Sequence, residues 1–382
     1  MLDFLNANPI LIMFAIAVIG YAFGRIRIKG LDLGTAAILL VALVFGYFSL
    51  AIPPIVQDLG LALFVTAVGF IAGPTFFRNF KSKAVAYVAL GAIIVLAGVL
   101  TCSVIILLSG IDTDFAVGVL AGALTTTPGL GVAKEAATDP TMATIGYGVA
   151  YPFGVIGVVL FVQLMPKIFK TDMKKERAQF VAANEAPKVE KKKKVLSMDP
   201  LGFFSFALAV ILGYLLGKIE IPLPGGVTFA LGTSGGPLIA GLVFGHFGSA
   251  LRVDLKIKKE TLVSLRELGL ALFLMGAGTK AGAGFEDVLA EQGAMLFVNG
   301  LLYGAIMTII PMIVGSFFAL KVFKLSMFNS LGTVCGGMTS TPALGALIQT
   351  TGTDDVTTAY AAAYPIAIAV IVISFQLVFL IF

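Results

Sequence analysis

Charge, histidine and cysteine are scarce in this sequence. Only 12% of the 382 residues are charged, against about 25% in a typical soluble domain. A soluble fold, a nucleic-acid binder and a disordered chain are therefore excluded. The single histidine, His246, excludes a multi-histidine metal centre, and Cys102 and Cys335 lie in separate apolar contexts that indicate neither a disulfide framework nor a metal site. We predict no cofactor and no metal ion.

Apolar residues and glycine are abundant instead. Hydrophobic residues make up 58% of the chain, and its 44 glycines exceed the roughly 7% of average usage. This composition predicts an all-α polytopic membrane protein whose surroundings are the lipid bilayer. A membrane span needs about 20 apolar residues, and ten segments qualify: about 9–24, 33–51, 58–74, 84–109, 143–165, 200–217, 227–248, 262–280, 291–319 and 356–382.

Two further apolar stretches, about 115–140 and 327–352, are interrupted by threonine, proline and glycine. A continuous helix does not form readily through such a break. We therefore predict a re-entrant hairpin in each stretch, entering and leaving on the same face of the membrane. Gly73-Pro74, in contrast, is interpreted as a helix end before a basic loop.

The basic residues test this layout. On it, 23 of the 26 lysines and arginines, Arg266 among them, fall in loops on one side; the exceptions are Lys134, Lys218 and Lys280. Cytoplasmic loops are enriched in basic residues, so the net charge of +5 sets orientation and requires no acidic partner. We expect a bacterial inner-membrane protein with both termini outside. Residues 1–24 lack the basic n-region of a signal peptide and are expected to remain as a membrane helix.

The lysine-rich segment 166–198 lies on the cytoplasmic side in this layout. We interpret it as a solvated tether, because charge runs are usually solvated. A specific binding motif is the alternative.

The two halves of the chain repeat one another. Leu59-Gly-Leu-Ala-Leu-Phe64 recurs letter for letter as Leu268-Gly-Leu-Ala-Leu-Phe273. Each half has five predicted spans, an odd number, so the second half is expected to be inverted in the membrane. We predict two inverted repeats, 1–165 and 199–382, each with five spans and one re-entrant hairpin. Inverted repeats with paired broken helices are typical of secondary transporters.

The breaks in the two hairpins are the candidate substrate site. In each, the threonine directly before the proline is a good N-cap, and the proline at the first helical position predicts the start of a short helix, whose N-terminus attracts anions. The alternative is that Thr-Pro only kinks a buried helix. The candidate residues are Thr125, Thr126, Thr127, Pro128, Gly129 and Gly131, with Thr339, Ser340, Thr341 and Pro342 in the second half.

Three further residues are candidates with open alternatives. Lys134 either neutralises a substrate carboxylate or pairs with Glu135 near the mouth of the hairpin. Tyr147 and Tyr360 either direct hydroxyls into the cavity or anchor the helices at the membrane interface. The sequence has no P-loop, no G-x-S-x-G and no H-E-x-x-H, so we expect neither an ATP-driven pump nor an enzyme.

Three motifs resemble the aspartate:alanine exchanger family: Gly69-Phe-Ile-Ala-Gly73-Pro74-Thr75-Phe76-Phe77, Thr125–Gly131 with Val-Ala-Lys-Glu, and Gly336-Gly337-Met338-Thr-Ser-Thr-Pro-Ala-Leu-Gly345. The resemblance covers nearly all of both membrane halves. It implies exchange of a small carboxylate or amino acid, such as aspartate or alanine, by a homodimer. Many similar proteins carry paired TrkA-C domains between the halves, where this chain has only segment 166–198. An ion-coupled symporter is the alternative function. An elevator-like and a rocking movement both remain open.

Overall fold

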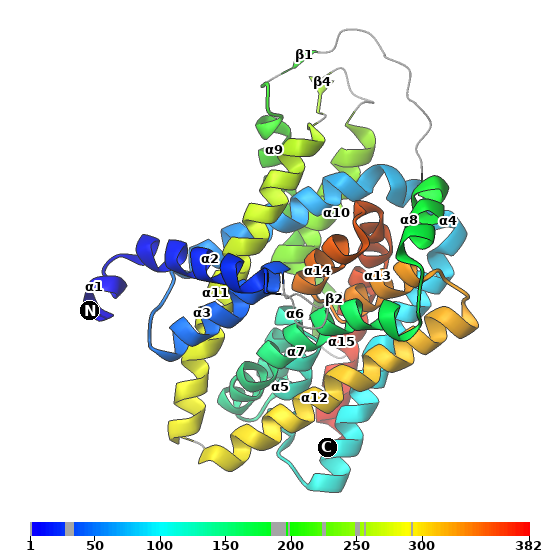
Figure 1. Ribbon diagram of the computed structural model, residues 1–382. Helices are drawn as coiled ribbons and strands as arrows, with labels where there is room; N and C mark the ends of the chain where they lie inside the picture. The colour runs from blue at the N-terminus through cyan, green and yellow to red at the C-terminus, as the bar shows by residue number, and fades with distance from the viewer. Residues whose placement is uncertain are drawn as a thin grey trace.

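The computed structural model describes residues 2–382 except 27–33, 185–195, 198, 224–226, 249–252, 256 and 292 (Figure 1). Nearly all of the described chain is helical. The first half contains α1 (Leu2–Asn6), α2 (Pro9–Gly24), η1 (Gly34–Ala36), α3 (Ala37–Tyr47), α4 (Pro54–Ser109), α5 (Thr113–Ala123), α6 (Thr127–Ala136) and α7 (Pro140–Ile168).

The second half follows a linker that contains α8 (Met173–Asn184). It consists of α9 (Phe203–Gly217), α10 (Gly232–Phe247), α11 (Lys259–Glu291), α12 (Gly293–Phe317), η2 (Phe318–Val322), α13 (Met327–Gly337), α14 (Thr341–Thr351), η3 (Asp354–Val356) and α15 (Thr357–Ile381). Two short ribbons complete it. β1 (Leu196–Ser197) pairs in parallel with β4 (Val253–Asp254), and β2 (Ile221–Leu223) pairs antiparallel with β3 (Val227–Phe229).

Six helical segments are long and apolar enough to cross a membrane: Pro54–Pro74, Lys83–Ser109, Pro140–Ile168, Lys259–Ala283, Ala294–Val322 and Asp354–Ile381. Four shorter apolar helices accompany them: Pro9–Gly24, Ala37–Tyr47, Thr113–Ala123 and Phe203–Gly217. The prediction of an all-α polytopic membrane protein is confirmed. Helix α3 is shorter than the span predicted there, since its 11 residues rise only about 16 Å at 1.5 Å per residue.

Helix α4 runs without interruption through Pro74, so the prediction that Gly73-Pro74 ends a helix is wrong. A proline inside a helix removes one backbone hydrogen bond, and the helix continues where other contacts support it. Close packing supports the helix here, because a Cβ at Gly73 would lie 2.4 Å from the carbonyl oxygen of Leu242 in α10. Figure 1 shows α4 turning between its first part, beside α10 and α11, and its second part, beside α12 and α15.

The helices form two bodies. Helices α2, α3, α9, α10 and α11 pack on one another and on residues 54–74 of α4; we call this set the scaffold. Helices α5, α6, α7, α12, α13, α14 and α15 pack together with residues 83–109 of α4, and we call this set the core body. Only α4 belongs to both bodies, and α11 leads directly toward α12.

Matched helices of the two halves run antiparallel. In the scaffold, Gln57 of α4 lies against Gly276 of α11, and Gly60 lies against Phe273. In the core body, Gly98 of α4 lies against Pro311 of α12, while Ile94 lies against Gly315. Antiparallel counterparts are the arrangement of inverted repeats. How the halves are oriented in a membrane stays a prediction.

The linker helix α8 is docked on the core body. Phe180 is buried, and its ring centroid lies 5.4 Å from that of Phe328 in α13. The Arg177 Nε donates a hydrogen bond to the Thr351 carbonyl oxygen at the end of α14. Interpreting residues 173–184 as a solvated tether is therefore wrong. Met173 and Phe180, seven residues apart, form an apolar stripe along α8 that the surrounding lysines obscure in the composition. The lysine run 191–194 lies outside the described residues.

Helix α9 begins at a carboxylate outside the membrane-spanning segments. The Asp199 side chain accepts hydrogen bonds from the backbone N–H groups of Leu201, Phe203 and Phe204 at 2.8–3.0 Å. These bonds, those from Phe204 and Phe203 first, hold the Asp199 pKa below its ordinary value.

Candidate functional site

The stretch after α4 folds as a hairpin, α5–α6, which we call hairpin 1. Helices α5 and α7 run parallel, since Gly118 lies against Ala143 and Gly122 against Tyr147. The Asp114 carboxylate accepts the backbone N–H groups of Thr138 at 3.3 Å and Asp139 at 2.6 Å. The start of α5 is thereby tied to the residues just before α7. Helix α6 must therefore return to the end from which α5 came.

The equivalent stretch of the second half, α13–α14, is hairpin 2. Gly332 lies against Val356 and Gly336 against Tyr360, so α13 and α15 also run parallel and α14 returns toward the start of α13. Ser326 caps α13 by accepting the Asn329 N–H at 3.3 Å. The returning limbs cross over between the halves, because α6 packs on α15 and α14 packs on α7.

The two hairpin tips are joined by reciprocal hydrogen bonds. The Thr125 hydroxyl donates to the Met338 carbonyl oxygen at 3.0 Å, and the Thr339 hydroxyl donates to the Leu124 carbonyl oxygen at 2.9 Å. Both threonines have left-handed backbone, with φ of 54° and 48°, a conformation that costs a non-glycine residue about 1–2 kcal/mol. The buried hydrogen bonds offset that cost, and they hold the tips as one unit.

Each tip is followed by the start of a short helix. The Thr126 hydroxyl accepts the Gly129 N–H at 3.1 Å, which caps α6. Pro128 and Pro342 are the second residues of α6 and α14, whose N-caps are Thr126 and Ser340, one residue before the threonines predicted. The cap differs in hairpin 2, because the buried Ser340 hydroxyl has no hydrogen-bond partner among the described residues.

A tyrosine hydroxyl lies beside a threonine hydroxyl at each tip. The Tyr147 hydroxyl lies 3.4 Å from the Thr127 hydroxyl, and the Tyr360 hydroxyl lies 3.3 Å from that of Thr341. Tyr360 is 1% exposed, so it lies in the protein interior and does not anchor a helix at an interface. The Tyr364 hydroxyl, one turn further along α15, is hydrogen-bonded to Ser234 of α10.

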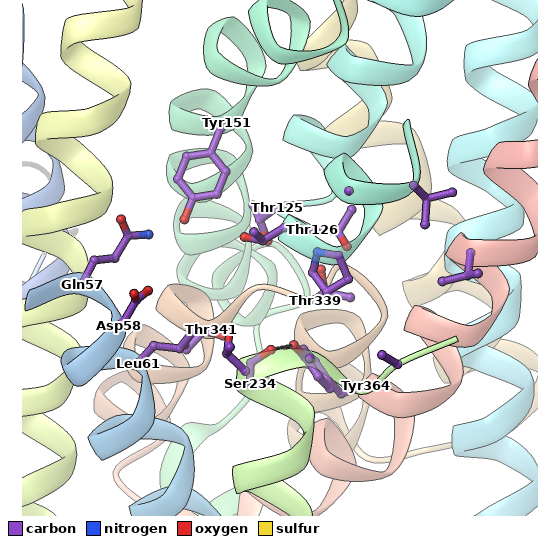
Figure 2. A pocket seen from close by; sticks show the side chains of 18 of the residues that line it. Gln57, Asp58, Leu61, Thr125, Thr126, Tyr151, Ser234, Thr339, Thr341 and Tyr364 are labelled. Atoms are coloured by element: carbon purple, nitrogen blue, oxygen red, sulfur yellow. Dashed lines mark hydrogen bonds between the residues drawn. The ribbon is translucent and has the colours of Figure 1, made fainter. Parts of the chain in front are cut away.

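A cavity of about 380 Å³ lies where the hairpin tips face the scaffold (Figure 2). Figure 2 shows threonines of both tips on one side, with Gln57, Asp58 and Leu61 of α4 opposite them. Eight of the predicted site residues line it: Thr125, Thr126, Thr127, Pro128, Gly131, Thr339, Thr341 and Pro342. The other five, Gly129, Lys134, Ser340, Tyr147 and Tyr360, are outside its lining. Substrate binding by any of these residues stays a prediction.

The scaffold residues of the lining were not predicted. Asp58 stands at the edge of an apolar run, and an ionisable residue within a membrane helix indicates a functional site, so the sequence did contain a signal. Phe273 of α11 and Thr233 and Ser234 of α10 gave none, because only the fold brings them to the hairpins.

The charged residues described in the cavity lining are of one sign. They are Asp58, Glu135 and Glu220, and no described lysine, arginine or histidine belongs to the lining. Lys134 is exposed and is not among the lining residues. Positive potential comes instead from the N-termini of α6 and α14, where backbone N–H groups lack helical partners. The cavity therefore combines an anion-attracting end at the tips with carboxylates from α4, α6 and the segment after α9.

Two helical hairpins that meet beside a cavity, with matched helices antiparallel, define an architecture of the secondary-transporter class. The chain belongs to the Asp-Al_Ex family, described as a predicted permease membrane region, which matches residues 12–167 and 205–380. This match confirms the resemblance to the aspartate:alanine exchangers.

Relatives named as uncharacterized transporters align over nearly their whole length. One from Bacteroides fragilis is 30% identical over 96% of this chain and 97% of its own. One from Geobacter sulfurreducens is 28% identical with the same coverage, and one from Corynebacterium glutamicum is 27% identical over 100% of both chains. The Bacteroides alignment spans 520 positions, which exceeds the 382 residues here. That relative therefore has residues without a counterpart in this chain.

Proposed function

We propose that this protein is a secondary antiporter that exchanges small carboxylates or amino acids, such as aspartate and alanine, by alternating access. The observation that carries the proposal is the cavity shared by both hairpin tips and the scaffold. Helix N-termini at membrane depth bind carboxylates in transporters of this class. The hydroxyls of Thr127 and Thr341 border the same space and supply further donors to a substrate carboxylate.

The scaffold side of the cavity can bind the ammonium group of an amino-acid substrate. The Asp58 carboxylate faces the tips across the cavity, and within the described part of the chain it forms no hydrogen bond or ion pair. An ammonium group held there would balance a charge that is costly to leave unpaired in a membrane protein. A zwitterion then spans the cavity with its carboxylate at the tips.

Movement in this proposal is relative motion of the core body and the scaffold. Because the reciprocal bonds of Thr125 and Thr339 join the tips, both hairpins travel together. The substrate site lies on the boundary between the bodies and is exposed first to one side and then to the other. An elevator-type displacement is consistent with hairpins that are joined and move as one unit.

A second candidate function is ion-coupled symport. It is favoured by the three carboxylates of the lining, Asp58, Glu135 and Glu220, which are groups that bind a proton or Na⁺. For either function we propose a homodimer in a bacterial inner membrane, with both termini outside and residues 166–198 cytoplasmic.

Counterflow in proteoliposomes separates the two functions. If the protein is an exchanger, vesicles should take up labelled aspartate only when they have been loaded with aspartate or alanine, and no ion gradient should be needed. Protein-free vesicles are the control for leakage. Uptake into empty vesicles that depends on a Na⁺ or proton gradient would support the symporter and overturn the antiporter.

A further inference from the structure

The two hairpins are related by the repeat, yet their surroundings differ. Helix α14 is buried from Thr341 to Ile348, whereas Thr127, Gly131 and Glu135 of α6 are exposed. Three contacts beside hairpin 2 explain this difference. The residues matched to the first two contacts line the cavity beside hairpin 1, and the third contact is an ion pair whose arginine is matched by a neutral residue of the lining.

The first pair is a glycine and a leucine. A Cβ on Gly345 of α14 would lie 2.4 Å from the Cδ of Leu270 in α11, so hairpin 2 presses directly on the scaffold. The repeat matches Gly345 with Gly131 and Leu270 with Leu61. Gly131 and Leu61 both line the cavity, and no atom lies within 4 Å of a Cβ built on Gly131.

The second pair is polar. The Gln349 side-chain amide donates to the Thr35 hydroxyl at 2.6 Å, which links α14 to η1. The matched residues are Glu135 and Thr233, because each threonine follows a left-handed glycine, Gly34 or Gly232. Glu135 and Thr233 both line the cavity, and no hydrogen bond joins them in the described part of the chain.

The third pair carries charge. Arg266 of α11, 6% exposed, forms an ion pair with Asp354 of η3. Lys259 approaches the same carboxylate at 3.1 Å, and Glu267 lies 2.9 Å from the Arg266 guanidinium. Arg266 had been predicted in a loop and lies inside α11 instead. Its matched residue is Gln57, which is neutral and lines the cavity.

We propose that these three contacts form a gate beside hairpin 2, which is closed. Leu61, Gly131, Glu135 and Thr233 form the matching gate beside hairpin 1, which is open. In the opposite state of the transporter, Leu61 packs on Gly131 while Leu270 and Gly345 separate and the Arg266–Asp354 pair breaks. The inference rests on the alternating access of the proposed function. Since, among the described residues, the gate beside hairpin 2 has an ion pair and the residues beside hairpin 1 have none, the state with the gate beside hairpin 2 closed is the resting state.

Cysteine pairs test the proposal, in a background where Cys102→Ala and Cys335→Ala remove the native thiols. Leu270→Cys with Gly345→Cys is expected to cross-link under mild oxidation in membranes. The leucine substitution also removes the methyl groups that a side chain at position 345 would strike. Leu61→Cys with Gly131→Cys is expected to cross-link little. Adding Arg266→Gln to the second pair is expected to raise its cross-linked fraction about tenfold, as for a shift out of a minor state.

Cross-linking of both pairs to high extent in one molecule would overturn the proposal, as would preferential cross-linking of the pair at 61 and 131 without Arg266→Gln. A separate measurement guards against misfolding of the paired variants: Gly131→Cys alone reacts rapidly with a membrane-impermeant maleimide if its gate is open, and slow reaction contradicts the assignment. These readouts require no substrate. If counterflow fails while the cross-linking pattern is as expected, the result would therefore count against the proposed substrates and not against the gate.

Discussion

The Thr339 hydroxyl donates a hydrogen bond to the Leu124 carbonyl oxygen at 2.9 Å, across 215 positions of the chain. Together with the matching bond from Thr125 to Met338, it makes the two hairpin tips one structural unit. The unit lies at the boundary of the core body and the scaffold, where the cavity is. Four predictions follow from this arrangement and its supports.

Replacing Thr339 with valine removes the donor but keeps the side-chain shape. It leaves the buried Leu124 carbonyl oxygen unpaired, which we expect to cost about 1–3 kcal/mol. Thermal unfolding in detergent should show a lower transition temperature, and exchange activity should fall because the tips separate. Thr101→Val is the matched control, since the Thr101 hydroxyl bonds only to the Ala97 carbonyl of its own helix. Equal destabilisation by both substitutions would contradict a special role for the joined tips.

Asp58→Asn removes a cavity carboxylate while keeping its size. If Asp58 holds the substrate ammonium, affinity for aspartate should fall by about 1.5–3 kcal/mol, the usual worth of a charged hydrogen bond. Affinity for a dicarboxylate without an amino group should not fall. Equilibrium binding of the two labelled compounds measures the difference. Asp172→Asn, on the exposed start of α8, is the control, and an equal loss for both compounds would refute the assignment of the ammonium.

Phe180→Ala tests the docking of α8. The buried Phe180 ring packs on Phe328, and truncating a buried phenylalanine typically costs about 3–5 kcal/mol. The loss is expected to be local, so limited proteolysis between α7 and α9 should accelerate while the membrane helices persist. Gln179→Ala, exposed on the same helix, should leave the cleavage rate unchanged. A linker as protease-sensitive in the wild type as in Phe180→Ala would contradict the docked helix.

Hydropathy and the repeat were sufficient to predict where the helices lie. Each predicted span overlaps a helix, because about 20 apolar residues in lipid have few alternatives, although some helices, α3 among them, are shorter than the span. The Thr-Pro breaks also begin helices, at Thr127 and Thr341, since a proline in the first turn of a helix is a local signal; the predicted N-caps were one residue too late. Local signals failed at Pro74, where packing against α10 supports the helix.

Apart from Asp58, whose charge at the edge of an apolar run was a signal, the scaffold side of the site could not be predicted from the sequence. Thr233 and Ser234 line the cavity only because α10 packs beside the core body, and no spacing along the chain encodes that contact. Arg266 shows the same limit. Its charge was consistent with a cytoplasmic loop, while the fold buries it against Asp354, 88 positions away.

Binding of labelled aspartate to the purified protein tests the central claim that the cavity between the hairpin tips and the scaffold is the substrate site. Thr127→Ala and Thr341→Ala should each weaken binding by about 1–2 kcal/mol, because each removes a hydroxyl at the start of a helix that faces the cavity. Thr350→Ala is the matched control on α14, since its hydroxyl bonds to the Ala346 carbonyl and is outside the lining; its affinity should equal that of the wild type. Unchanged affinity in both Thr127→Ala and Thr341→Ala, in protein that unfolds at the wild-type temperature, would contradict the account.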